Sequence, residues 1–358
     1  MRVGLVIYGD LNTRTGGFLY DRLLVEHLRA RGDTVEVISM PWRAYPLCLL
    51  HNLAPGWFNR LKRLEVDVLL QDELTHPSLF GINQRLRRAG RAPRVAIVHH
   101  LRASEPHPSH WLRLYRRVER AYLRTLDGCI YNSPATQASV AELAGVHLPG
   151  VVATPGGDRL GTFAPDQIRA RCSRAEPLRL LFLGNLLARK GLHDLISALA
   201  RLKDEDWFLT IAGRADLEPA YAQRQMLEVN AMQLSRRVAF RGDVPDESLP
   251  AILSQTDLLV VPSHYEGFGI VYLEAMAFGI PAIAGSAGGA AGIIQPEING
   301  WLVPPGDPNA IRAIIQRLCN DRAELRRVSL AARERFEAFP GWDQRMSAIL
   351  YYFHTMAG

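Results

Sequence analysis

Cysteine is scarce in this 358-residue chain, and the few cysteines that occur are scattered. The four are Cys48, Cys129, Cys172 and Cys319, and no two of them form a C-x-x-C pair. Such spacing favours neither a disulfide framework nor a cysteine-bound metal. We therefore expect buried or half-buried free thiols in a reducing compartment.

Long apolar runs are also missing. No stretch approaches the roughly 20 apolar residues that a membrane-spanning helix needs. The chain opens on a strand-like segment, MRVGLVIYGD, in which Asp10 falls too early for the core of a signal peptide. Both absences predict a cytoplasmic protein. Its 48% hydrophobic and 22% charged residues are typical of a globular chain, and its length suffices for two domains.

The net positive charge is confined to the first half of the chain. Residues 1–160 carry 21 basic and 14 acidic residues (21 − 14 = +7), whereas residues 161–358 carry 21 and 22 (21 − 22 = −1). Much of the excess is arginine within 84–94 and 111–124. Nucleic acid, an anionic membrane surface or an acidic substrate would each fit this bias, and so would a solvated helix face.

The first half alternates short apolar runs with amphipathic stretches. The runs lie at 2–8, 34–40, 66–72, 94–100 and 128–133. An amphipathic helix is expected at 18–32, closed by Gly32. Continuous apolar strands separated by helices indicate a parallel sheet that is covered on both faces.

The alternation restarts in the second half. Its strand-like runs lie at 178–184, 207–213, 237–244, 257–263, 281–286 and 300–305. Residues 154–167, rich in Gly and Pro, separate the two series and predict a linker. We expect α/β domains at 1–160 and 161–340, and a C-terminal helix at 341–358 that packs back toward the first domain. Ligands of such folds lie beyond the carboxyl ends of the strands.

The strongest motif is PSHYEGFGIVYLEAMAFGIPAIAGSAGG, residues 262–289. Glu266 follows a buried strand and precedes the Gly-Phe-Gly turn at 267–269, and a helix expected from Ile270 carries Glu274. Backbone N–H groups at such a helix start form an anion site that suits a diphosphate. A carboxylate on either side suits a ligand with a ribose at one end and a hexose at the other.

This frame resembles the family-4 retaining glycosyltransferases of the GT-B fold. Their hallmark is E-G-F-G-x-x-x-x-E-A-M-A-x-G-x-P, in which the two glutamates are Glu266 and Glu274 here. The resemblance continues through 298–308 and covers the chain at the level of strand order. It implies two Rossmann-like, doubly wound parallel-sheet domains facing a central cleft. The first would be the acceptor-side domain, and the second would bind the nucleotide sugar.

A basic pair opens the helix after the first strand of the second half. The strand ends at Gly184, and Arg189 and Lys190 follow. Two cations at a helix start oppose the macrodipole unless an anion shares the site, and a diphosphate fits that need. The resemblance implies that this pair binds the donor diphosphate. Family members commonly carry Arg directly after the strand glycine, where this chain has Asn185.

Further segments match the family less specifically. The loop at 15–17, Thr-Gly-Gly, resembles one that approaches the donor phosphate, although an ordinary turn explains it equally well. His99 follows a buried strand, where family members carry a histidine that faces the donor sugar. Asp243 and Val244 lie where the family chain passes the nucleoside base.

Together these observations give three sets of candidate residues. The catalytic set is Glu266, His99, Arg189 and Lys190. The donor-binding set is Gly16, Gly17, Arg189, Lys190, Asp243, Val244, Gly267, Phe268, Gly269 and Glu274. The acceptor-side set, from a polar strand exit, is His100, Arg102 and Glu105.

The resemblance implies a retaining transfer of a hexose from a UDP or GDP sugar to the hydroxyl of a glycan, lipid or small-molecule acceptor. No cofactor is expected, and no catalytic metal, because no D-x-D lies at a strand end and no His/Asp cluster has metal-ligand spacing in the sequence. Peripheral contact with an anionic membrane, at its inner face, is left open by the arginine excess.

Three other functions would need features of their own. A phosphorylase of the same fold needs a pyridoxal-binding lysine, for which Lys62, Lys190 and Lys203 offer no candidate. A catalytically degenerate sugar-nucleotide sensor or scaffold remains the alternative function, although it would need a broken site. Nucleic-acid binding is not expected, because no basic motif with interleaved aromatic residues occurs.

Overall fold

The computed structural model describes residues 1–174 and 176–357, which form two compact units. One unit comprises Met1–Pro155 and Trp342–Gly358, and the other comprises Gly156–Gly341. The backbone therefore passes from one unit to the other twice. Within the described residues, no helix has both the length and the apolar character needed to cross a membrane.

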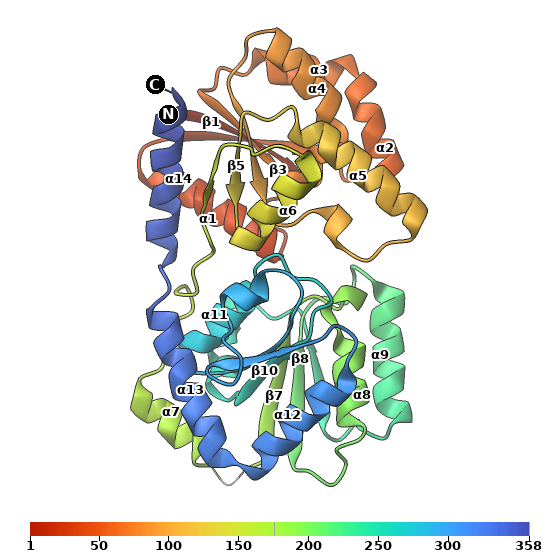
Figure 1. The fold of residues 1–358 in the computed structure, drawn as a ribbon, viewed down its shortest axis with the longest axis vertical. Coiled ribbons are helices and arrows are strands. Elements are labelled where there is room, and N and C mark those ends of the chain that lie inside the picture. Colours follow the sequence, from red (N-terminus) through yellow and green to blue (C-terminus); the bar gives the residue numbers. More distant parts are fainter. Residues whose placement is uncertain (175, 358) are drawn as a thin grey trace. The chain divides into compact units, whose positions relative to one another are not determined.

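The first unit is built on a six-stranded sheet with the order β2-β1-β3-β4-β5-β6. Figure 1 shows β1, β3 and β5 of this sheet with helices around them. Its strands are β1 Arg2–Tyr8, β2 Thr34–Met40, β3 Val68–Asp72, β4 Arg94–Val98, β5 Gly128–Tyr131 and β6 Gly150–Val152. Neighbouring strands pair in parallel. Every residue of β3, β4 and β5 is buried, which explains their continuous apolar runs. Strand β6 was not predicted from the sequence, because a strand of three residues is too short to show an apolar pattern.

The helices of the first unit connect these strands and cover the sheet. They are α1 Gly16–Ala30, α2 Tyr45–Leu49, α3 Pro55–Arg63, α4 His76–Arg88, α5 Ser109–Leu123, α6 Pro134–Ala144 and α14 Trp342–Ala357. Helix α1 begins two residues earlier than predicted, because the Thr15 side chain caps it by accepting the Phe18 N–H. Helix α14 packs against α1 and β6.

The second unit repeats the architecture with the strand order β12-β11-β10-β7-β8-β9. Its strands are β7 Leu178–Leu183, β8 Trp207–Ala212, β9 Val238–Gly242, β10 Leu258–Val261, β11 Ala282–Gly285 and β12 Gly300–Val303. Its helices are α7 Pro165–Cys172, α8 Leu192–Leu199, α9 Pro219–Ala231, α10 Leu249–Ser254, α11 Ile270–Ala277, α12 Pro308–Asn320 and α13 Arg322–Glu337. All six strands were predicted from the sequence, to within a few residues at each end.

In each sheet the direction of winding changes once. The chain leaves β1 toward β2 and later returns to the other side of β1 as β3. It likewise leaves β7 toward β8 and returns beside β7 as β10. Connections that diverge in this way leave a crevice at the carboxyl ends of the two central strands, where ligands of doubly wound sheets bind. The candidate residues should therefore follow these strands.

Candidate active site

Lys190 and Glu266 meet at the carboxyl ends of β7 and β10. Lys190 follows β7 in a short 3-10 turn, Ala188–Lys190, and Glu266 follows β10. The Lys190 ammonium donates a hydrogen bond to Glu266 Oε2, and the two side chains are only 14% and 13% exposed. Ser263 Oγ donates to the same oxygen at 3.3 Å. The two candidates are thus brought together into one ion pair.

Backbone packing sets this arrangement. Gly191 has a φ of 73°, and a Cβ atom there would lie 2.3 Å from the carbonyl oxygen of Pro262. The His264 N–H donates to the Arg189 carbonyl oxygen at 2.7 Å, and the Arg189 guanidinium donates to the Tyr265 carbonyl oxygen at 3.4 Å. The turn after β7 and the loop after β10 are therefore fixed to each other largely through main-chain atoms.

Glu274 lies on α11 and is 2% exposed. Its Oε1 accepts a hydrogen bond from Arg159 Nε, and Arg159 Nη1 lies 2.7 Å from Asp246 Oδ2. Burial raises the pKa of Glu274, and the Arg159 guanidinium offsets part of that rise. Arg159 was not predicted from the sequence. It connects α11 to the segment that contains the expected nucleoside-base residues.

The remaining candidate residues for binding the sugar donor in the second unit lie on either side of the contact between Arg159 and Glu274. Asp243 and Val244 line a surface hollow between the end of β9 and α10. Gly269 precedes α11 with a φ of 96°. Phe268 is buried and its ring packs near that of Phe339, so donor contacts at this turn would come from the backbone.

His99, in the first unit, is buried among acidic side chains. Its Nε2 lies 3.1 Å from Asp21 Oδ1, and its backbone N–H donates to Glu73 Oε2 at 2.9 Å. Asn132 Nδ2 donates to the His99 carbonyl oxygen at 2.6 Å. A Cβ atom at Gly17 would lie 3.0 Å from His99 Cδ2. The glycine loop and His99, two separate predictions, are therefore in contact.

Burial controls the protonation of this cluster. It raises the pKa of Asp21 to about 7 and that of Asp72, which Asp21 also repels, to about 8. It raises the pKa of Glu73 well above its ordinary value. It lowers the pKa of His99, so the imidazole is neutral near physiological pH and donates one N–H.

The acceptor-side candidates form a polar cluster after β4. His100 Nε2 lies 2.9 Å from Glu105 Oε1, and His107 Nε2 lies 3.6 Å from the other oxygen of Glu105. The guanidinium of Arg102 lies 4.7 Å from the ring centroid of Tyr115 on α5. His100, Arg102, Glu105 and His107 are each held by neighbours and partly exposed, which suits recognition of hydroxyl or phosphate groups.

Sequence reasoning missed several groups that the fold brings together. Among the described residues, two clusters have ligand atoms close enough to hold a metal ion. They are His193, Asp194 and His264 in the second unit, and Asp21, Asp72 and His99 in the first. Asp72 was detectable, because it ends a buried strand. Asp194 and His264 are 70 residues apart, and no local pattern links them.

Solved structures define the class of the fold. Sucrose-phosphate synthase from Thermosynechococcus elongatus matches with a TM-score of 0.83 at 25% identity, covering 99% of this chain and 98% of that one. HepE from Anabaena, solved with UDP and glucose, matches with a TM-score of 0.78 at 21% identity, covering 98% and 99%. These matches confirm the predicted GT-B class of two Rossmann-like parallel-sheet domains.

Sequence comparisons point to one family. Residues 165–335 match the model of "Glycosyl transferases group 1". The chain is 29% identical to glycogen synthase of Mycobacterium tuberculosis over 296 residues, which is 79% of this chain and 69% of that enzyme. It is 28% identical to the MMP alpha-(1->4)-mannosyltransferase of Mycolicibacterium hassiacum, over 96% of this chain and 95% of that one. Residues 165–335 thus match the group 1 glycosyltransferases, the family that the motif resembles.

Because Gly191 lies against Pro262, adding a methyl group at position 191 should lower the stability of the folded protein. Gly191→Ala should destabilise the protein by about 3 kcal/mol, because left-handed strain of about 1 kcal/mol adds to a clash with backbone of about 2 kcal/mol. Gly306→Ala is the matched control, since Gly306 has a φ of 74° but no atom within 4 Å of its Cβ position. Urea unfolding measures both, and equal losses would contradict the packing argument.

Proposed function

We propose that this chain is a retaining glycosyltransferase of group 1. It moves a hexose from a UDP or GDP sugar to an acceptor hydroxyl, with neither a metal ion nor another cofactor in the chemical step. The observation that carries the proposal is the Lys190–Glu266 ion pair, which joins a cation suited to a diphosphate with a carboxylate suited to sugar hydroxyls. HepE, which has the same fold, binds UDP-glucose, and this supports a nucleotide-sugar donor here.

Each end of the donor has a proposed partner in the second unit. Arg189, Lys190 and the backbone N–H groups of Gly267 to Gly269 bind the diphosphate, because cations and helix-start N–H groups both stabilise anions. Glu266 binds hydroxyls of the sugar. Glu274 gives up its hydrogen bond from Arg159 and binds the ribose instead. Asp243 and Val244 line the site of the base.

The first unit supplies the remaining roles. Gly16 and Gly17, the first two residues of α1, let the backbone at that helix start approach the donor phosphate, since neither carries a side chain. His99, neutral and held by Asp21, donates a hydrogen bond to the sugar. His100, Arg102 and Glu105 bind the acceptor, which would be a glycan, a lipid or a small molecule.

The proposed reaction replaces one bond to the anomeric carbon with another on the same face. The bond to the diphosphate oxygen breaks and its electrons stay with the diphosphate, which Arg189 and Lys190 stabilise. The acceptor oxygen forms the new bond, and its proton passes to the departing diphosphate oxygen. No side chain has to act as general base, so catalysis consists of positioning and anion stabilisation.

Substituting each of the two glutamates in turn should separate an effect on turnover from an effect on the affinity for the nucleoside diphosphate. Glu266→Gln keeps the shape of the side chain but removes its charge, so we expect at least a hundredfold lower turnover and a nearly unchanged Kd for the nucleoside diphosphate. Glu274→Ala removes the proposed ribose contact and should chiefly raise that Kd. Steady-state kinetics and calorimetry measure the two effects.

Glu247→Gln, an exposed glutamate of the same unit, is the control for loss of one negative charge. Unchanged turnover in Glu266→Gln would remove Glu266 from the catalytic residues. The alternative function, a sugar-nucleotide sensor or scaffold, predicts nucleotide binding without transfer or no selective binding at all. Thermal unfolding with a panel of nucleoside diphosphates, followed by product analysis with nucleotide sugars, distinguishes these cases.

Turnover should survive chelation. The proposed site neutralises the diphosphate with Arg189 and Lys190, which can replace a divalent ion at the leaving group. We expect turnover in excess EDTA within a few fold of that in magnesium, measured by release of the nucleoside diphosphate. Complete loss in EDTA, restored by magnesium or manganese, would show that the chemical step needs a metal.

The surface of the first unit supports a membrane partner. Helix α5 and the residue that follows it expose five arginines, which are Arg113, Arg116, Arg117, Arg120 and Arg124. Its Tyr115 contacts Tyr45 at the start of α2, with ring centroids 4.7 Å apart. Residues 42–63, which include Tyr45, contain no acidic residue. In this segment Trp42 is 60% exposed and Leu53 is 78% exposed. We propose a cytoplasmic protein that contacts the inner face of an anionic membrane through this surface.

This contact predicts salt-sensitive binding to anionic vesicles. Each basic residue near an anionic surface adds about 1 kcal/mol, so changing Arg113, Arg116 and Arg117 together to Gln should weaken binding about a hundredfold at low salt. Donor hydrolysis should not change. Cosedimentation with phosphatidylglycerol vesicles measures the binding.

The matched control changes three exposed arginines of the second unit, Arg224, Arg236 and Arg326, to Gln. It removes the same charge from another surface and should bind vesicles nearly as well as the parent. Equal losses in both triple variants would indicate an unspecific charge effect. No loss in either would leave the α5 arginines as a solvated face.

A further inference from the structure

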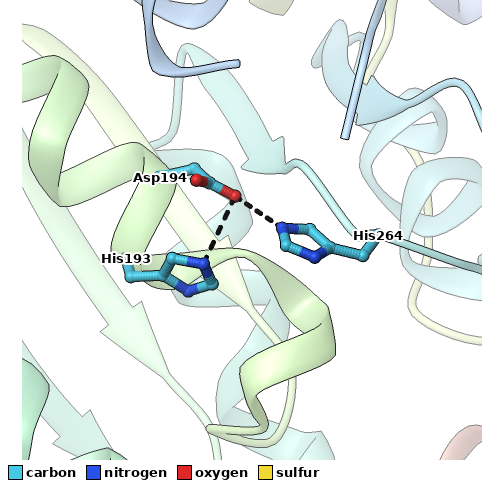
Figure 2. A group of neighbouring side chains, drawn as sticks. All are labelled: His193, Asp194 and His264. Carbon is cyan, nitrogen blue, oxygen red and sulfur yellow. Dashed lines mark hydrogen bonds and ion pairs between the residues drawn. The ribbon is translucent and has the colours of Figure 1, made fainter. Parts of the chain in front are cut away.

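Three side chains of the second unit point at one another beside the candidate site (Figure 2). His193 and Asp194 begin α8, and His264 follows β10. His264 Nε2 lies 2.8 Å from Asp194 Oδ2, and His193 Nε2 lies 3.6 Å from the same oxygen. The three atoms all lie within 4.8 Å of one another, and both rings turn toward the carboxylate.

The backbone brings these side chains together before any ligand binds. The close approach of Gly191 to Pro262 joins the start of α8 to the end of β10. The hydrogen bond from His264 N–H to the Arg189 carbonyl oxygen, 2.7 Å long, adds a second connection. A cluster that is fixed by main-chain packing loses little further freedom on binding an ion, which favours binding.

Two imidazole nitrogens and one carboxylate oxygen are a ligand set that Zn²⁺ prefers. Ligand atoms about 2.1 Å from a tetrahedral ion lie about 3.4 Å apart, so the His193–Asp194 separation already fits. The His264–Asp194 separation of 2.8 Å would lengthen by about 0.6 Å, and the separation of the two histidine nitrogens, at most 4.8 Å, would shorten by up to about 1.4 Å, which side-chain rotations provide. His193 and His264 are 36% and 26% exposed, so an ion can enter and water can supply a fourth ligand.

Tyr221, on α9, holds the ring of His193 from the far side. Its hydroxyl oxygen lies 2.9 Å from His193 Nδ1 and accepts the His193 backbone N–H at 3.2 Å. When a metal occupies Nε2, the ring proton must sit on Nδ1, where the tyrosine oxygen can accept it. Metal-bound histidines usually have such a partner on the second nitrogen, and it fixes both tautomer and ring orientation.

We propose that His193, Asp194 and His264 bind one Zn²⁺ ion. The ion would clamp the start of α8 to the loop that leads to Glu266, and it is a structural ion rather than a reactant. The second cluster of the structure, Asp21, Asp72 and His99, is buried throughout and offers an ion no comparable access. The zinc proposal is independent of the proposed glycosyl transfer, because it is tested without donor or acceptor.

Calorimetry and thermal unfolding test the site directly. The full chain without a histidine tag is stripped with EDTA, dialysed and titrated with ZnSO₄. We expect one zinc ion per chain, and a rise in Tm of about 5 °C or more at a zinc concentration a hundredfold above Kd. Mg²⁺, which prefers oxygen ligands, should give no comparable rise. Absence of zinc binding by the parent protein would overturn the proposal.

Variants locate the ion. His193→Gln combined with His264→Gln should abolish the stoichiometric binding, whereas His147→Gln, at an exposed histidine of the first unit, should leave it unchanged. Undiminished binding by the double variant would show that zinc binds elsewhere and would overturn the assignment. If the double variant does not fold, His193→Gln alone decides, because a loss of affinity of less than about tenfold would exclude this ligand set.

Tyr221→Phe separates a metal site from a hydrogen-bonded cluster. It keeps every ligand but removes the oxygen that orients His193, so we expect a Kd for zinc about 10- to 100-fold higher. Cobalt(II) gives a second readout, since bound cobalt should show visible absorption that is lost in the His193/His264 variant. Zinc affinity and cobalt absorption that are unchanged in every variant would leave only a hydrogen-bonded cluster.

Discussion

Parallel strands can be joined only by crossovers that return the chain to the same edge, so all strands of such a sheet end at one edge. Both units obey this constraint, and in each the winding reverses once, between β1 and β3 and between β7 and β10. The residues with proposed chemical roles follow these strands or their neighbours. The proposed chemistry therefore depends on a few short segments, each anchored by the buried strand before it.

Within the second unit, main-chain packing determines which charged side chains pair with each other. The contact of Gly191 with Pro262 brings two loops together, and Lys190 then lies against Glu266. A buried carboxylate without a partner would cost several kcal/mol, so each glutamate of the motif is paired with a cation. Binding of a diphosphate would give the lysine a second anion without leaving the glutamate uncompensated, because sugar hydroxyls can donate to it.

The parts of the molecule that the sequence predicted are those with a local signature. Buried strands show as apolar runs, and the Glu266–Glu274 frame shows as glycines and acids at fixed spacing. Groups assembled across the sheet have no such signature. Arg159 lies in a segment that reads as linker, and the hydrogen bond from His264 to Asp194 joins residues 70 positions apart. Their positions depend on strand order and register, which single-sequence patterns do not encode.

The buried acids of the first unit impose a cost that grows with pH. The pKa of Asp21 is about 7 in the folded chain against an ordinary 3.8, so above pH 4 the folded state holds a proton that the unfolded state releases, and stability falls as the pH rises toward 7. Asp21 lies 3.1 Å from His99 Nε2. A protonated Asp21 donates to that nitrogen and leaves the imidazole proton on Nδ1, whereas an ionised Asp21 accepts from Nε2–H. The proton on this carboxyl group thus decides whether Nδ1 of His99 carries a hydrogen that it can donate to a ligand, which gives a physical reason for keeping an acid in an otherwise costly place.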